Sequence, residues 1–521
     1  TVAADGMIVQ KNGTTYTGTI VNSATLSSTV YSMPSSFILW TVGNPTITLD
    51  EGITKTFLDT SADNTSWAHI IDVSGIPSGS TATMTVEIAS GTYTVELPAA
   101  TPVSVAGSKP TAVLSYAPLG QFARGTSWGS IYSNYSNTEG AAASDALVKF
   151  ASGTGYSGVG VSLGAFGGYI DFYFQGGITN DAKNPYGVDF VIYGNAFNAN
   201  PEAGAVQVSE DGITWYELAG SQYYEGNFAV SSKTQASGKF SKGYSGTLRN
   251  ATVNYTGTSS KISAVVTAGT TTMTVDPLIN SYGWWPTAAK GYPAIGAHVN
   301  SNSTGTSNVQ VACNDTTFSS TGLTLIPDSD TTADYAYGYA DVTPNGSPAT
   351  YGDAINPYTP YTSSKTGGDG FDLEWAVDIT TGEPVDVTDM IFRYVRVYSA
   401  VLDNGTFGET STEICGIFTT ANKSAATVGR TDEPVLKIGD YNIWDLEENG
   451  DISVTETSYG LFIDASERGY NDVRLTATST DTANIYFNNE YTDTFDRADR
   501  EYVRVIVQDG TAAPFMALIK F

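Results

Sequence analysis

The chain has 521 residues, and 53 Asp and Glu against 24 Lys and Arg give it a formal net charge of −29. A surface this acidic repels phosphate backbones and anionic lipid, which excludes nucleic acid as an expected partner and favours hydrated cations such as Ca²⁺. No run of about 18 apolar residues occurs, so we expect no segment to insert into a membrane.

The length is too great for a single hydrophobic core and predicts about three domains. The first residue is Thr1 and no apolar leader follows it, from which we expect a mature secreted chain. The two cysteines, Cys313 and Cys415, either form a disulfide or remain buried free thiols, and their spacing does not decide between the two.

The residue usage is typical of a β protein. Gly (54) and Tyr (32) are abundant, and alternating apolar and polar residues recur between short turn sequences. Residues 81–98 are two such runs joined at Ser90-Gly91, which predicts a hairpin. The best short helix candidate is 143–151, and no longer helical period occurs. We therefore expect an all-β fold of three serial β-sandwich domains.

Two stretches rich in Pro, Ala, Gly and Ser, at 96–111 and 419–435, have the composition of linkers. They predict an N-terminal Ig-like sandwich, a central sandwich and a C-terminal Ig-like sandwich, with bounds 1–105, 106–425 and 426–521. Within the central domain, residues 228–340 are rich in Ser, Thr and Gly but keep the apolar alternation, which predicts inserted β-hairpins. The last residues, "APFMALIKF", predict a strand that completes its own domain or adds to a neighbour's sheet.

The stretch from 184 to 218 predicts scaffold strands. Its segment "VDFVIYG" is a continuous apolar strand expected to be buried on both faces, and Gly194-Asn195 is expected to bend it at a sheet edge. The following "SEDGITWYEL" predicts a two-stranded hairpin closed by Asp211-Gly212.

An ordered series of motifs then appears: "GYIDFYF", "YGVDFVIYGNAF", "DGITWYELAGSQYY", "GGDGFDLEWAVD" and "GETSTEI". Together they resemble a family of secreted bacterial cell-surface proteins, over roughly 110–228 and 335–416 of this chain. The resemblance implies a jelly-roll-like or Ig-like β-sandwich core similar to carbohydrate-binding modules, an extracellular or cell-surface location, and no established enzyme activity. Family members often carry a longer acidic loop before "WYELAG". Here it is cut to Glu210-Asp211-Gly212, which puts an ion site in that loop in question.

The sequence contains few residues and motifs that are suited to catalysis. His69 and His298, the only histidines, fall in different predicted domains, so a Ser-His-Asp triad, a His-rich zinc site and a His general base are each hard to build. The letters "GVSLG" and "GTGYSG" match a nucleophile elbow and a dinucleotide loop, but neither is followed by the helix that such a motif needs. We expect no enzyme and no catalytic residues.

Two groups of oxygen-bearing side chains are candidates for calcium. The first is "DLEENGDISVTE", which follows the spacing of an EF-hand loop but is flanked by apparent strands, so a hairpin turning at Asn449-Gly450 is the competing interpretation. Its candidate ligands are Asp445, Glu447, Asn449, Asp451 and Glu456.

The second group belongs to the central domain and is expected to gather at one end of its sandwich. Three interpretations stay open: Ca²⁺ ligands, turn carboxylates that accept backbone N–H bonds, or a glycosidase pair of Asp372 with Glu409 or Glu413. The candidates are Asn195, Glu202, Asp369, Asp372, Glu409 and Glu413.

Aromatic clusters are candidates for stacking on sugar rings, although Tyr and Trp also serve as contact surfaces between subunits. They comprise Trp284, Trp285, Tyr335, Tyr337 and Tyr339. With so little catalytic chemistry, we predict a structural subunit of a secreted filament, sheath or surface layer that contacts copies of itself, is stabilised by calcium, and assembles through β-domain contacts or strand addition by a chain terminus. The alternative is a cell-surface adhesin that binds glycans through these aromatic clusters.

Overall fold

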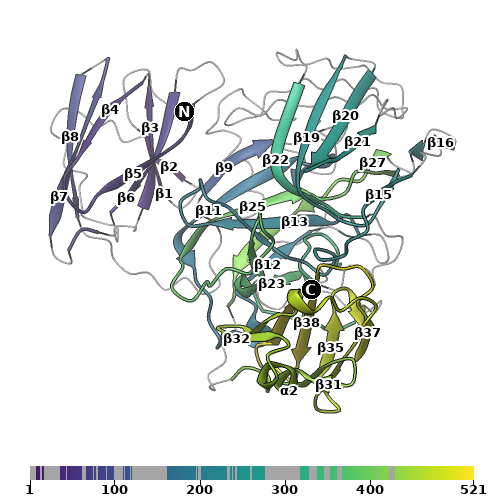
Figure 1. The fold of residues 1–521 in the computed structure, drawn as a ribbon. Helices are drawn as coiled ribbons and strands as arrows, with labels where there is room; N and C mark the ends of the chain where they lie inside the picture. The colour runs from purple at the N-terminus through teal and green to yellow at the C-terminus, as the bar shows by residue number, and fades with distance from the viewer. Residues whose placement is uncertain are drawn as a thin grey trace.

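This computed structural model describes the chain outside residues 1–7, 12–13, 17–35, 43, 61–65, 74, 78–79, 90, 99–109, 111, 118, 120–160, 195, 197–200, 232–234, 237–238, 241–242, 259–260, 276–316, 328–336, 345–351, 361–366, 406–407 and 422–428. The helix expected at 143–151 therefore lies outside the described residues, as do Asn195, Trp284, Trp285, Cys313 and Tyr335, and the side chain of Glu409. The described chain is almost entirely β, as the alternating sequence predicts (Figure 1).

The N-terminal part is a sandwich of two antiparallel sheets (Figure 1). Leu39 and Ile71 from one sheet and Met84 and Val86 from the other form its core, because alternate residues of each strand point inward. The larger sheet has the order β2 (Thr14–Tyr16), β1 (Ile8–Lys11), β3 (Ser36–Val42), β6 (Ser66–Asp72) and β5 (Thr54–Thr60). The smaller has β4 (Thr46–Leu49), β7 (Thr81–Ile88) and β8 (Gly91–Pro98), in which β7 and β8 are the predicted hairpin.

The central part is built on a six-stranded antiparallel sheet that faces a three-stranded one. The strands predicted from "VDFVIYG" and "SEDGITWYEL" are confirmed: all four residues of β12 (Phe190–Tyr193) are buried, and β13 (Gly204–Ser209) pairs with β14 (Tyr216–Leu218). The larger sheet has the order β24 (Ala376–Asp378), β14 (Tyr216–Leu218), β13 (Gly204–Ser209), β25 (Phe392–Ser399), β11 (Tyr169–Ile178) and β9 (Ala112–Ala117). The smaller has β23 (Asp369–Phe371), β12 (Phe190–Tyr193) and β29 (Gly416–Thr419).

The residues predicted to form inserted hairpins do form strands. Four of these strands form a separate antiparallel sheet. Its apolar face packs on the central strands through Val253, Tyr255 and Leu323. This sheet has the order β21 (Thr271–Val275), β20 (Lys261–Ala268), β19 (Leu248–Thr258) and β22 (Thr317–Leu325). Short strands complete the region: β10 (Val161–Ser162) with β28 (Glu413–Ile414), β15 (Ala229–Val230) with β18 (Tyr244–Ser245), and β16 (Gln235–Ala236), β17 (Lys239–Phe240), β26 (Asn404–Gly405) and β27 (Gly408–Glu409).

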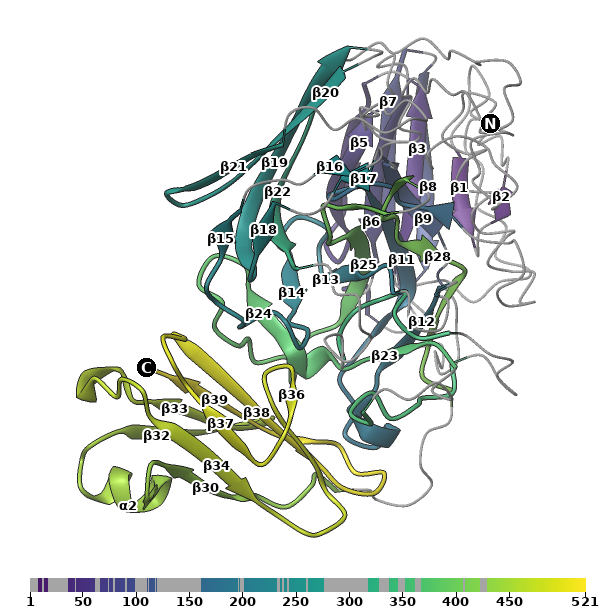
Figure 2. The same cartoon turned by 90° about the vertical axis from the view of Figure 1, so that its right-hand side faces the viewer.

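The C-terminal part is a second two-sheet sandwich (Figure 2). One sheet has the order β31 (Tyr441–Asn442), β30 (Val435–Ile438), β34 (Arg474–Thr478) and β37 (Thr494–Asp496). The other has β32 (Ser453–Thr457), β33 (Gly460–Asp464), β39 (Phe515–Lys520), β38 (Tyr502–Gln508), β35 (Asn484–Phe487) and β36 (Glu490–Tyr491). Among the described residues of the whole chain, the helical segments are α2 (Ile443–Glu448) and the short 3-10 turns Pro185–Gly187, Leu373–Trp375 and Ser466–Arg468.

The last strand of the chain completes its own domain. β39 lies inside the six-stranded sheet, parallel to β33 and antiparallel to β38. Its backbone is therefore already paired on both sides, and the suggestion that this end of the chain adds to a neighbour's sheet is wrong, because only an unpaired edge can do so.

The C-terminal sandwich shares a core with the central one. β38 is buried along its whole length because its two faces meet different partners: Val503, Val505 and Val507 enter the core of the C-terminal sandwich, and Ile506 packs in the core of the central one. Tyr486 and Met516 join Trp375 and Tyr337 in that same cluster. In Figures 1 and 2 the two sandwiches lie directly against each other.

Candidate metal centre

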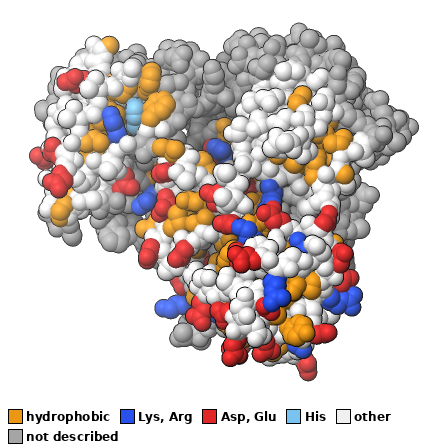
Figure 3. All heavy atoms as spheres, viewed as in Figure 1, with side chains coloured by type: hydrophobic (Ala, Val, Ile, Leu, Met, Phe, Trp, Pro, Cys, Tyr) orange, Lys and Arg blue, Asp and Glu red, His pale blue; other side chains and the backbone are white. Residues whose placement is uncertain are grey.

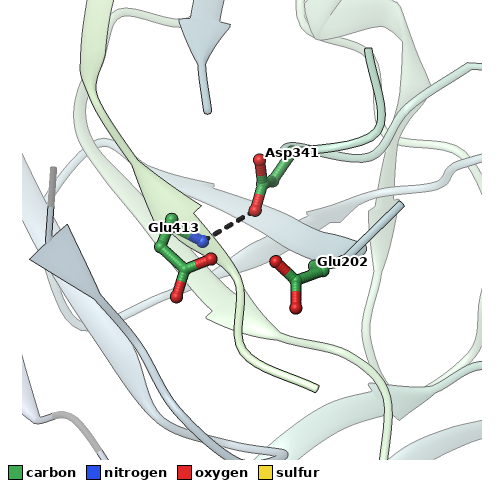
Figure 4. Close-up of side chains that lie close together, drawn as sticks. All are labelled: Glu202, Asp341 and Glu413. Atoms are coloured by element: carbon green, nitrogen blue, oxygen red, sulfur yellow. Dashed lines mark hydrogen bonds between the residues drawn. The ribbon is translucent and has the colours of Figure 1, made fainter. Parts of the chain in front are cut away.

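Three carboxylates from distant parts of the chain meet at one end of the central sandwich. Glu202, Asp341 and Glu413 each place a carboxylate oxygen within 4.8 Å of the others (Figure 4). Glu202 lies just before β13, Asp341 lies in the buried segment 337–343, and Glu413 opens β28. Among the described residues this is the one such cluster of three or more acidic, His or Cys side chains.

The backbone holds these three positions in register. Ala340 and Gly204 form an antiparallel bridge, with N–H to O distances of 2.8 and 2.9 Å, and the Glu202 N–H donates to the Asp341 carbonyl at 3.0 Å. The Glu413 N–H donates to Oδ2 of Asp341 at 2.8 Å (Figure 4). The three segments are therefore tied together through their main chains as well as through the acidic side chains.

The position of Asp341 is enforced by its neighbours. Its φ of 62° lies in the left-handed region, which costs a residue with a Cβ about 1–2 kcal/mol. Its Oδ1 would lie 2.1 Å from a Cβ placed on Gly194, so only glycine at 194 leaves room for the carboxylate. Gly194, which the sequence predicts to lie at a bend, thus also forms a cradle for an acidic group.

The charges in this cluster repel one another. Burial raises the pKa of Glu202 well above its usual range, and Glu413 and Asp341 raise it further, against a backbone hydrogen bond from Ser411 that lowers it. Asp341 and Glu413 are both buried, whereas Glu202 is half-buried. Either a proton or a cation must offset this negative charge.

The donor set fits a hard cation. All three ligands are carboxylate oxygens, which Ca²⁺ prefers, and the cation would complete its shell with water or backbone carbonyls. Cys415, two residues beyond Glu413, is a free thiol whose pKa is raised by burial and by Asp341 and Glu413.

Two predicted ligands of the central domain, Glu202 and Glu413, are therefore brought together, and two others are not part of the cluster. Asp369 accepts the Val342 N–H at 3.2 Å, next to Asp341 in the chain. Asp372 lies in a different buried group. Burial is the main cause that raises its pKa, and the neighbouring carboxylates of Glu374 and Asp189 raise it further. Glu413, one of the two glutamates suggested as a glycosidase partner of Asp372, is grouped with Glu202 and Asp341, whereas the side chain of the other, Glu409, lies outside the described residues.

The EF-hand spacing does not produce an EF-hand loop. Asp445 and Glu447 lie in α2, whose N-cap Asn442 accepts the Trp444 N–H at 2.9 Å, so these two side chains belong to a helix. Asp451 forms an ion pair with Arg468. Asn449 and Glu456 are exposed. Among the described residues these carboxylates form no cluster with metal-ligand spacing. The competing hairpin is also wrong, because β31 pairs with β30 and β32 with β33.

The tyrosines proposed for sugar stacking are core residues. Tyr337 and Tyr339 are each only 2 % exposed, so neither ring presents a face to a ligand. The Tyr337 hydroxyl donates to the Asn488 carbonyl at 3.0 Å, and the Tyr339 hydroxyl accepts the Gln222 N–H at 3.1 Å. Alternating Tyr in "YGYAD" indicates two buried anchors rather than a platform.

Asp341 is the ligand that was missed among the candidates. It stands in "GYAD", and no local spacing links it to Glu202 or Glu413, which are 139 and 72 residues away along the chain. The bridge between Ala340 and Gly204 brings Asp341 close to Glu202, and the hydrogen bond from the Glu413 N–H to Oδ2 of Asp341 holds Glu413 beside it.

Comparisons with protein-family models, with curated proteins and with solved structures found no match. No helix among the described residues is long and apolar enough to cross a membrane.

Proposed function

We propose that this protein is a secreted structural component of a cell surface, a subunit of a filament, sheath or surface layer, whose central sandwich is stabilised by Ca²⁺. The observation that supports this most is the cluster of Glu202, Asp341 and Glu413 with its Gly194 cradle. A cation bound there joins three segments that the chain brings from far apart, as a structural ion does. The acidic surface visible in Figure 3 favours uptake of such cations.

The energetic benefit follows from mass action. A ligand that binds only the folded state stabilises it by about 2.7 kcal/mol when its concentration is 100 times its dissociation constant. Sites of extracellular modules commonly bind Ca²⁺ with dissociation constants of about 10⁻⁴–10⁻³ M. An extracellular subunit would therefore be tightened in calcium-rich surroundings and loosened by chelation.

The C-terminal junction supports a mechanical role. Arg430 joins Glu374 of the central part to backbone carbonyls of the C-terminal part, and Arg500 pairs with Glu225 at 2.7 Å across the same boundary. Together with the shared core, these contacts make the two sandwiches one continuous body. A rigid subunit transmits load between neighbouring copies better than flexibly linked domains.

The test compares calcium responses of matched variants. Isothermal titration and thermal unfolding of the wild type with Ca²⁺, Mg²⁺ or EDTA should show binding and a higher midpoint with Ca²⁺, and Glu413→Gln should lose both. Glu456→Gln, an exposed carboxylate of the EF-hand-like stretch, is the control and should behave as wild type. A response of equal size in the two variants would contradict the assignment.

Assembly is tested separately by light scattering of the native protein with and without EDTA. Large particles that dissociate on chelation support a calcium-stabilised assembly of identical subunits. A monomer of about the chain mass that is indifferent to EDTA would refute the assembly role.

A further inference from the structure

A histidine is buried inside the N-terminal sandwich. His69 lies on β6, and its side chain is only 7 % exposed. It pairs across the sheet with Leu39, and Ile71 lies two residues further along β6; both of these side chains belong to the core between the two sheets. Because side chains alternate along a strand and face their cross-strand partners, the imidazole of His69 points into the same core.

The imidazole lies in apolar surroundings. Both of its ring nitrogens are buried, and neither makes a hydrogen bond within the part of the chain that the structure describes. The centre of the Phe57 ring lies 5.4 Å from that of the imidazole, with an angle of 64° between the two planes. The facing sheet contributes Ile47, Met84 and Val86 to this core. A proton on the imidazole would therefore place a charge where no acceptor binds it, which is strongly unfavourable.

The cation next to this ring closes one side of the sandwich. Lys55 lies on β5, the strand beside β6, and its Nζ donates to the Ile47 carbonyl of β4 at 3.3 Å. Among the described strands, β5 and β4 are each the outer strand of their sheet (Figure 1). The hydrogen bond of Lys55 thus connects the two sheets at their edge, and His69 lies one strand further in.

No described carboxylate faces the imidazole from the strands packed around it. Asp72 follows Ile71 directly and so lies on the opposite face of β6, 4.0 Å from Arg393 of the central part. The carboxylates of the facing sheet and its first turn are exposed, namely Asp50, Glu51, Glu87 and Glu96. Burial, and to a smaller extent the positive charge of Lys55, lowers the pKa of His69 from 6.5 to about 4.

We propose that His69 is an acid-sensitive latch of the N-terminal sandwich: a proton added to its imidazole detaches β5 from β4 and opens this side of the sandwich. The neutral ring packs in the core and leaves Lys55 free to reach β4. The protonated ring repels Lys55 and can be hydrated only when the edge strand moves away. The latch is remote from the carboxylate cluster in the chain and does not depend on the proposed calcium role.

The pH effect has a definite direction. In the opened state His69 is in water, where its pKa is about 6.5, whereas in the closed state its pKa is about 4. The closed state is therefore favoured in full above about pH 6.5, and it loses this advantage as the pH falls toward 4. From these two values, the equilibrium constant for opening should rise about twentyfold between pH 7 and pH 5.

The decisive experiment is hydrogen–deuterium exchange of the full chain at pH 7 and pH 5, expressed as protection factors so that the intrinsic pH dependence of exchange is removed. The amides of β5 and β6 should lose about twentyfold in protection in the wild type. His69→Leu, which stays uncharged, should keep its protection. The control is His298→Gln at the other of the two histidines, and it should behave as wild type. Equal losses in the wild type and in His69→Leu would overturn the latch.

A second variant tests the role of Lys55. Lys55→Gln keeps a hydrogen-bond donor for the Ile47 carbonyl but removes the charge. Its loss of protection at pH 5 should be smaller than that of the wild type and still present, because burial is the larger cause. A loss as large as in the wild type would overturn the repulsion between Lys55 and the protonated ring.

If His69→Leu does not fold, nuclear magnetic resonance of the wild type decides. The chain has only two histidines, so His298→Gln assigns their imidazole signals. In the closed state the His69 ring should remain neutral down to about pH 5. A ring that titrates near pH 6.5 while β5 stays protected would overturn the proposal.

Discussion

Replacing Arg430 by Met should uncouple the two sandwiches. The Arg430 guanidinium donates to both oxygens of Glu374, at 2.6 and 2.8 Å, and also to the carbonyls of Ser458, Tyr459 and Pro514. One side chain thus links the central part to three backbone groups of the C-terminal part. Its removal leaves the Glu374 carboxylate, whose side chain is 4 % exposed, without its cation.

The expected loss of stability follows from how deeply the ion pair of Arg430 and Glu374 is buried. Breaking a buried ion pair by removing one partner costs about 3–5 kcal/mol, since the remaining charge is stranded. Solvent reaches 22 % of the Arg430 side chain, which reduces the expected loss to about 2–4 kcal/mol. The matched control is Arg474→Met, whose pair with Asp496 has exposures of 65 % and 70 % and should contribute less than about 1 kcal/mol.

The assay is urea unfolding of the three proteins, followed by calorimetry to separate the transitions of the two sandwiches. We expect Arg430→Met to lower the free energy of unfolding and to split one transition into two. Adding Glu374→Gln to Arg430→Met removes the stranded charge and should restore a large part of the loss. Equal losses for Arg430→Met and Arg474→Met would refute the reasoning, because burial would then not decide the effect.

Three further predictions concern single sites. Gly194→Ala places a Cβ 2.1 Å from Oδ1 of Asp341, so it should destabilise by about 1–3 kcal/mol and remove the calcium-dependent rise in melting temperature; an unchanged calcium response would argue against the cradle. Burial raises the pKa of Glu217 to about 8, above its unfolded value of about 4.3, so its contribution to stability is complete below pH 4 or so and is lost as the pH rises through about 8. Between about pH 6 and pH 8 the wild type should therefore lose about 2 kcal/mol relative to Glu217→Gln in pH-dependent urea titrations, and parallel profiles would disprove it. Asp451→Asn removes only the ion pair with Arg468, so calcium titration should be unaltered, and a lost calcium response would return the binding site to the 445–456 stretch.

Local sequence determined the kind of protein and several of its strands. An alternating pattern specifies a strand wherever one face is buried, and a run such as "VDFVIYG" specifies a strand buried on both faces, because side chains point alternately to the two sides of a sheet. The hairpin of β7 and β8 and the buried strand β12 followed from these patterns alone. Each involves residues that are close along the chain.

Tertiary structure decided the candidate site. Glu202 and Glu413 were recognised as oxygen donors by residue type, but the third member, Asp341, was not, since its partners lie in other segments. The EF-hand-like spacing was misleading for the opposite reason: its letters are local, yet Asn442 caps a helix that carries Asp445 and Glu447 out of any loop. Spacing along a chain does not determine the distance between side chains unless the backbone conformation between them is known.

The contact between the central and C-terminal sandwiches could not be predicted from the sequence either. The stretch at 419–435 has the composition of a linker, but it leads into a sandwich that shares its core with the central part through Tyr486, Ile506 and Met516. The letters "EYVRVIVQ" predict a strand, and an arginine in it would ordinarily face water. Arg504 is instead buried because a second sheet covers that face, and only the packing of the two sandwiches, set by contacts between residues far apart in the chain, determines this.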